Sequence, residues 1–147
     1  RDRSPSRGLG DVYKRQTLRQ PHSIMNLISA LSFHQATTQI PQYLSVALPR
    51  GVRLPKVLVM PVKAWFVTPS LLLDGYEAHQ GDYGAFNVTT LERTLVDCFK
   101  YRNKIGLDIF IEALELTRGK WNAWKLQKEA DRLRVLSAIT PYLKMAQ

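Results

Sequence analysis

The sequence predicts an α+β fold: a mostly antiparallel sheet of about four to five strands, preceded by one helix and followed by a helical C-terminal part. Three observations predict it. Between residues 43 and 88, short runs rich in Val and aromatic residues end at Gly, Pro or Asp turns, as strands do. From residue 89 onward, apolar residues recur every three to four positions, which is the helical period. The expected strand connections are short, and short connections favour antiparallel neighbours.

Residues 1–16 are predicted to be a disordered tail. They show no apolar period and are rich in Ser, Gly, Pro and Arg, so they cannot bury enough surface to offset the entropy of ordering. The run resembles translated adapter sequence at the broken ends of metagenome-derived reading frames, which favours a non-native origin. A basic arm that reaches a nucleic-acid groove is the alternative. The folded domain is therefore expected over residues 17–147.

The first helix is predicted over residues 22–33, where Ile24, Leu27, Ile28 and Leu31 have helical spacing. Strands follow, with an apolar plug at residues 71–73 and a turn at Asp74-Gly75 before the last two. The last two strands form a hairpin with Gly81-Asp82 in its turn. The predicted strands are residues 43–48, 56–60, 62–67, 76–80 and 83–88.

One helix, from Thr89 to Ile105, organises the prediction. Thr89 and Glu92 have the spacing of a capping box, and Gly106 supplies the positive φ that commonly ends a helix. The apolar residues between these ends form a single face that must be buried. This face consists of Leu91, Leu95, Cys98, Phe99 and Ile105, whereas Arg93, Lys100, Arg102 and Lys104 are expected largely off it.

The C-terminal part is predicted to hold three more helices. The first covers residues 107–116 and closes at Gly119, and the second covers residues 122–139 with Asn122 as its N-cap. A short last helix begins at Thr140-Pro141, because proline is favoured in the first helical position. The apolar positions expected in the first two are Ile109, Phe110, Ala113, Leu114, Leu116, Trp124, Leu126, Ala130, Leu133, Leu136 and Ile139.

Composition excludes several classes of protein. The single cysteine among 147 residues excludes an intramolecular disulfide and a multi-cysteine zinc site, so a reducing cytoplasm fits best. No apolar run approaches the roughly 20 residues that cross a bilayer, so no membrane association is expected. His22 and His34 flank the first helix without other ligands nearby. We therefore expect no metal and no cofactor.

The net charge of +9 is compatible with an anionic partner such as nucleic acid. Basic residues cluster near the C-terminus, and Lys125, Lys128 and Arg132 are spaced to form one stripe on a helix. A solvated helix face is the more ordinary interpretation of such a stripe. The candidate contacts to nucleic acid or an acidic partner are Arg118, Lys120, Lys125, Lys128 and Arg132.

No catalytic constellation is recognisable, and the chain is expected not to be an enzyme. Glu92 and Asp97 are five residues apart and face different sides of one helix. Asp74 and Glu77, with Lys56 or Lys63, could form a nuclease-like cluster, but turn residues beside strands explain both acids. Cys98 lies on an apolar face, where a buried hydrophobe is the usual meaning, and its only plausible base is His79.

Six segments of the chain carry a resemblance to a known family. The most specific is residues 94–108 (TLVDCFKYRNKIGLD), and the others are residues 29–34 (SALSFH), 38–41 (TQIP), 47–51 (ALPRG), 112–114 (EAL) and 141–143 (PYL). These segments are similar to the AbiEi family of antitoxins, the transcriptional regulators of type IV toxin–antitoxin systems in abortive infection, a form of phage defence. The resemblance covers about residues 18–147.

The resemblance implies a cytoplasmic antitoxin that counters a nucleotidyltransferase toxin without forming a tight complex, and that binds promoter DNA to autoregulate its operon. Family members carry an N-terminal winged helix-turn-helix ahead of this region, and about twenty residues precede it here. The sequence is thus expected to represent the C-terminal antitoxin domain, from a truncated gene model. A stand-alone basic nucleic-acid-binding module is the alternative, and a nuclease-like enzyme is the third hypothesis.

Overall fold

The fold is known from a computed structural model that describes residues 23–52, 61–81 and 84–146. Five strands form one sheet in the order β3-β2-β1-β5-β4. Their number and the α+β class are as predicted. The strands are β1 (Ile24–Met25), β2 (Leu44–Pro49), β3 (Val62–Val67), β4 (Tyr76–Gly81) and β5 (Gly84–Thr89).

The sheet is mixed, so the prediction of a mostly antiparallel sheet is wrong. β1 pairs antiparallel with β2 and β4 pairs antiparallel with β5, but β2–β3 and β1–β5 are parallel. Parallel neighbours require a long crossover. The connection between β2 and β3 includes residues 53–60, which lie outside the described residues.

The predicted helix over residues 22–33 begins later, as α2 (Leu27–Phe33), because Ile24 and Met25 form the central strand β1. Only Asn26 separates strand from helix, and Leu27 adopts a positive φ of 44°, which lets the chain turn abruptly. Asn26 and Ser29 then bind β2. Asn26 Oδ1 accepts from the Ser45 hydroxyl at 2.7 Å and Ser29 Oγ accepts from the Ser45 amide at 2.8 Å.

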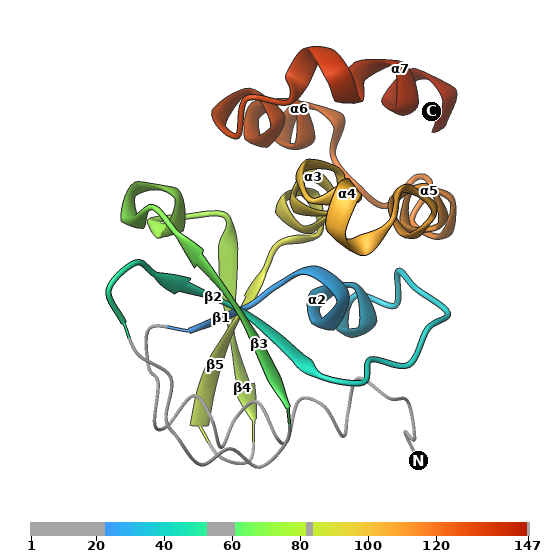
Figure 1. Ribbon diagram of the computed structural model, residues 1–147. Helices are drawn as coiled ribbons and strands as arrows, with labels where there is room; N and C mark the ends of the chain where they lie inside the picture. Colours follow the sequence, from blue (N-terminus) through green and yellow to red (C-terminus); the bar gives the residue numbers. More distant parts are fainter. Residues whose placement is uncertain (1–22, 53–60, 82–83, 147) are drawn as a thin grey trace.

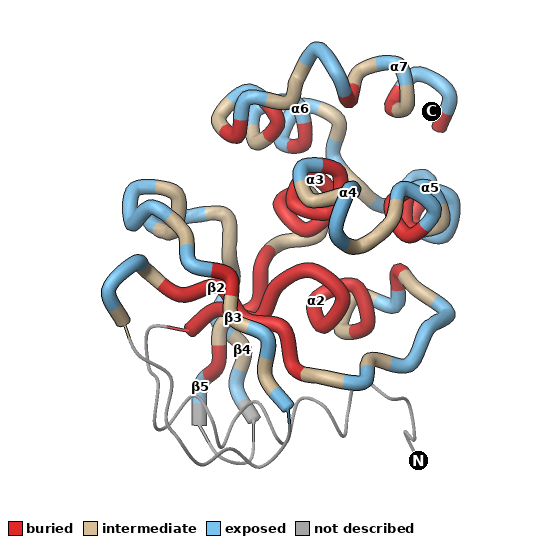
Figure 2. Tube along the Cα trace, viewed as in Figure 1, coloured by how far each residue is buried: buried red, intermediate tan, exposed pale blue. Residues whose placement is uncertain are grey.

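The helices are stacked on one side of the sheet. Figure 1 shows α2 beside the strands, then α3, α4 and α5, and α6 and α7 furthest from the sheet. Buried residues concentrate along β1, β2, α2 and α3 (Figure 2). The later helices are α3 (Leu91–Lys100), α4 (Arg102–Ile105), α5 (Leu107–Leu116), α6 (Ala123–Arg132) and α7 (Leu136–Ala146), and a 3₁₀ turn η1 spans Pro69–Leu72.

The organising helix is present, divided at Tyr101 into α3 and α4. Its N-cap is Thr90, whose hydroxyl accepts the Arg93 amide at 3.2 Å, so the predicted Thr89–Glu92 capping box is wrong. Thr89 belongs to β5. Gly106 ends α4 with φ 105°, as its placement predicted. Leu95, Cys98 and Phe99 are fully buried; Leu91 and Ile105 are partly buried.

The C-terminal helices depart from the prediction at two points. The stretch 122–139 is interrupted, because α6 ends in a Schellman motif with Arg134 at φ 63° and the Val135 amide bonded to the Ala130 carbonyl at 2.9 Å. Pro141 lies inside α7 rather than opening a last helix. The N-cap Asn122 is confirmed: its Oδ1 accepts the Lys125 amide at 2.9 Å.

Two apolar assignments in these helices are also wrong, since Trp124 is 67% exposed and Leu116 is 41% exposed. The predicted tail 1–16, the predicted strand 56–60 and the turn residue Asp82 lie outside the described residues. Among the helices that are described, none has the length and apolar character that crossing a bilayer requires.

Candidate functional site

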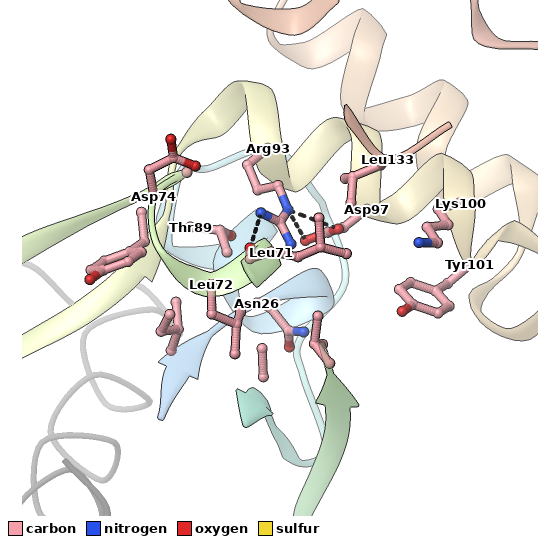
Figure 3. A pocket seen from close by; sticks show the side chains of 15 residues that line it. Asn26, Leu71, Leu72, Asp74, Thr89, Arg93, Asp97, Lys100, Tyr101 and Leu133 are labelled. Atoms are coloured by element: carbon pink, nitrogen blue, oxygen red, sulfur yellow. Dashed lines mark hydrogen bonds and ion pairs between the residues drawn. The ribbon is translucent and has the colours of Figure 1, made fainter. Parts of the chain in front are cut away.

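The most unusual polar feature is a buried ion pair on α3. Arg93 and Asp97 are four residues apart, so both side chains lie on one side of the helix. Arg93 Nε donates to both carboxylate oxygens of Asp97, at 3.1 and 3.2 Å, and Arg93 Nη1 donates to the Leu71 carbonyl in η1 at 2.8 Å. Figure 3 shows the guanidinium between α3 and this turn. The pair therefore connects α3 to the segment ahead of β4.

Arg93 was predicted to lie largely off the apolar face, but its burial was not predicted: Arg93 is 3% exposed and Asp97 5% exposed. Burial raises the pKa of the Asp97 carboxyl, and the charge and hydrogen bonds of Arg93 oppose that rise. The enclosed space beside the pair measures only ≈ 10 Å³, about the volume that one water needs. This arrangement suits a structural ion pair and leaves no room for a substrate.

An open groove of ≈ 340 Å³ lies close by, between the turn ahead of β4 and helix α6. Its lining combines four carboxylates with three cationic side chains, so its charges nearly balance. The lining residues are Asp74, Gly75, Glu77, Thr90, Glu92, Trp124, Lys125, Lys128, Glu129 and Arg132.

The groove is where the structure places Lys125, Lys128 and Arg132 of the predicted basic stripe. Arg132 forms ion pairs with Asp74 and, at 2.7 Å, with Glu129. The Lys128 ammonium lies 4.9 Å from the centroid of the Trp124 ring. Carboxylates thus compete with any phosphate for this stripe.

The other two predicted contacts lie outside the groove lining. Arg118 pairs with Glu115 at 3.4 Å on the exposed side of α5, and Lys120 is exposed in the following turn. The five predicted residues therefore do not form one basic surface.

Gly75 lies in a closely packed part of the groove, so replacing it should affect the stability of the fold. Its φ is +82°, and a Cβ there would lie 2.8 Å from Glu129 Oε2 and 3.0 Å from Arg93 Nη1. Gly119 has the same φ of +82° but open space around it. Gly119→Ala is expected to cost about 1–2 kcal/mol from backbone strain alone. Gly75→Ala should cost more, because the ion pairs must also shift. Urea unfolding of the two variants checks this, and equal losses would contradict the crowding around Gly75.

Other candidate groups are engaged elsewhere. Asp74 faces Arg132 rather than Lys63, which lies over Trp65 on β3, and Lys56 lies outside the described residues. The expected burial of Cys98 is confirmed, and burial raises the pKa of its thiol well above the usual value. His79 packs against Phe33 with ring centroids 4.7 Å apart and the ring planes tilted by 59°.

His34 Nε2 donates to the Thr89 carbonyl at 2.8 Å, and burial lowers the pKa of this imidazole. In the part of the chain that the structure describes, no group of three or more His, Cys, Asp or Glu side chains is arranged to hold a metal ion.

Sequence reasoning missed Arg93 and Glu129 as parts of this polar cluster. Their spacing was the available signal: Arg93 precedes Asp97 by four residues, and Glu129 precedes Arg132 by three. Glu92, predicted as half of a capping box, instead accepts the Asn122 amide at 2.9 Å and joins α3 to the start of α6.

Comparison with known proteins adds no identification, since no protein-family model and no curated protein sequence matches this chain.

Proposed function

We propose that this chain is the antitoxin and regulatory domain of an AbiEi-like type IV toxin–antitoxin system and that it catalyses no reaction. The observation that carries the proposal is the block of residues 94–108, in which the family resemblance is most specific. This block makes up most of α3, all of α4 and the start of α5. Its side chains Leu95 and Phe99 are fully buried. A resemblance in this block therefore concerns the framework of the domain and not a surface loop.

The polar side chains of α3 support a non-catalytic role. Arg93 and Asp97 use their polar atoms on each other and on the Leu71 carbonyl, and Glu92 binds the Asn122 amide. A group engaged in this way is poorly placed to bind a substrate or transfer a proton. We infer that these residues hold the domain together, while its action on the toxin pathway comes from its surface.

Co-expression with a nucleotidyltransferase toxin encoded beside this gene tests the proposal. Cells that produce the toxin together with the full chain are expected to grow, whereas the toxin alone arrests growth. Phe99→Ala, which removes a fully buried core side chain, serves as the control that should lose rescue through loss of fold. Growth arrest despite soluble, folded wild-type chain would contradict the antitoxin role.

A stand-alone nucleic-acid-binding module is the second candidate. The net charge of +9 favours it. The contribution to operon autoregulation that the resemblance implies would also require nucleic-acid binding. The balanced charges of the groove make the α6 stripe a poor phosphate site, so any such binding has to use another surface.

A further inference from the structure

A second charged surface lies at the edge strand β3, beside the end of α3 and helix α4. Lys63 and Trp65 are two residues apart on β3 and so share one face of the strand, toward the helices. Tyr101 and Lys104 approach from the α3–α4 junction. We call this the cation–aromatic surface, and it consists of Tyr43, Arg50, Lys63, Trp65, Lys100, Tyr101 and Lys104.

Aromatic rings and ammonium groups alternate across this surface. Trp65 packs against Tyr101 with ring centroids 4.7 Å apart and the ring planes tilted by 50°. The Lys63 ammonium lies 4.8 Å and the Lys104 ammonium 5.6 Å from the centroid of the Trp65 ring. Lys63 also approaches the Tyr43 ring at 5.9 Å, and Lys100 approaches Tyr101 at 6.0 Å. Trp65 itself is only 7% exposed, so this area presents the lysine side chains and the half-buried tyrosine rings to solvent.

No ion pair among the described residues neutralises the positive charge of the cation–aromatic surface. Arg50, Lys63, Lys100 and Lys104 are all exposed, and none forms an ion pair with another residue in the described ranges. Burial and the charge of Asp97 raise the pKa of Tyr101, and the positive charges of Arg93 and Arg50 oppose that rise, so Arg50 acts on the same ring. The Asp97 carboxylate also acts on Tyr101, but it is bound by Arg93. The α6 stripe differs, because its arginine already faces two carboxylates.

Two ammonium groups near one ring repel each other, and a bound anion would relieve that repulsion. A phosphodiester chain supplies anions at regular spacing, and its bases can lie against tyrosine rings such as Tyr43 and Tyr101, which are half-buried. The surface is formed by the edge strand β3 and the short helix α4 rather than by a projecting recognition helix. This shape favours a flexible single strand over the groove of a duplex.

We propose that the cation–aromatic surface binds single-stranded nucleic acid through its phosphate backbone, without reading the sequence. This inference does not rest on the antitoxin role. Its failure would show in a binding assay, whereas failure of the antitoxin role would show in growth.

The test is a fluorescence-anisotropy titration of the full chain with labelled oligo(dT) and oligo(U) of about 16 nucleotides, the upper site size of single-strand modules. Three proteins are compared over a range of salt concentrations: wild type, Lys63→Gln/Lys104→Gln, and Lys125→Gln/Lys128→Gln. Both variants lose two positive charges, so they are matched in net charge. Circular dichroism confirms that each protein is folded.

The wild type should bind with an affinity that falls as salt rises. Lys63→Gln/Lys104→Gln should bind about tenfold more weakly or worse, and its salt slope should be smaller by about 1.4, since each lost single-strand phosphate contact is worth about 0.7. Lys125→Gln/Lys128→Gln should keep the wild-type slope. A preference between oligo(dT) and oligo(U) identifies DNA or RNA as the natural ligand.

Equal weakening in both variants would overturn the proposal, because it would show only a general charge effect. Unchanged binding by Lys63→Gln/Lys104→Gln would overturn it as well. Equal or tighter binding to a duplex of the same length would overturn the assignment to single strands.

Discussion

Replacing Asp97 by alanine is expected to lower the free energy of unfolding by about 3–5 kcal/mol. The cost arises because Arg93, which is 3% exposed, would keep its charge in the interior without a carboxylate partner. Its bond to the Leu71 carbonyl cannot compensate for that loss. Urea unfolding at neutral pH, followed by circular dichroism, measures the change.

Glu115→Ala is the matched control for Asp97→Ala. Glu115 also pairs with a nearby arginine, in the turn that follows α5, but both side chains of the Glu115–Arg118 pair are exposed. An exposed pair of this kind contributes about 1 kcal/mol or less. Similar losses in the two variants would mean that the Arg93–Asp97 pair is no more important than a surface pair.

Phe99→Ala is the second large expected effect, again about 3–5 kcal/mol of unfolding free energy. Phe99 is fully buried on α3 and its ring centroid lies 5.0 Å from that of Phe110 on α5 and 5.5 Å from that of Tyr142 on α7. The Arg102 guanidinium also lies 4.1 Å from the Phe99 ring. Truncation would leave a cavity where three helices meet, and equilibrium urea unfolding would report it.

Trp124→Ala provides the control for Phe99→Ala. Trp124 is 67% exposed, and its recorded aromatic contact is with the Lys128 ammonium. An exposed cation–π contact is worth about 0.5–1 kcal/mol, so the expected loss is small. If Trp124→Ala destabilised the chain as much as Phe99→Ala, the assignment of the core to α3, α5 and α7 would be wrong.

The sequence predicted those elements whose signals are local. The β4–β5 hairpin, the helix over residues 107–116 and the Asn122 cap each depend on residues within a few positions of one another. Capping residues and short apolar periods act over the same range. Even so, the N-cap of α3 is Thr90 and not the predicted Thr89, because Thr89 pairs with Tyr76 in the sheet as part of β5.

The sheet topology could not be predicted in the same way. β1 has two residues, and Ile24 and Met25 continue the apolar pattern of α2, so the period indicated one helix. The pairing of Met25 with Val88 joins residues far apart in sequence, and no local pattern specifies it. Because β1 was not recognised in the sequence, neither the parallel β1–β5 pair nor the parallel β2–β3 pair was expected.

The charges of the two surfaces also depend on contacts between residues far apart in sequence, which no local pattern predicts. The spacing of Lys125, Lys128 and Arg132 gave the stripe correctly, but the facing Asp74 comes from a distant turn. Lys63 and Lys104 meet at one tryptophan ring from β3 and α4. Which cations form ion pairs, and which remain available to a partner, is therefore known only from the folded structure.

The account depends most on Arg93 and Asp97 acting as one structural unit within α3, and a double-mutant cycle measures this directly. The unfolding free energies of Arg93→Met, Asp97→Ala and the double variant are compared with that of the wild type. The double variant is expected to lose less stability than the two single variants lose together, because it leaves no unpaired charge in the interior. Additive losses would contradict the account.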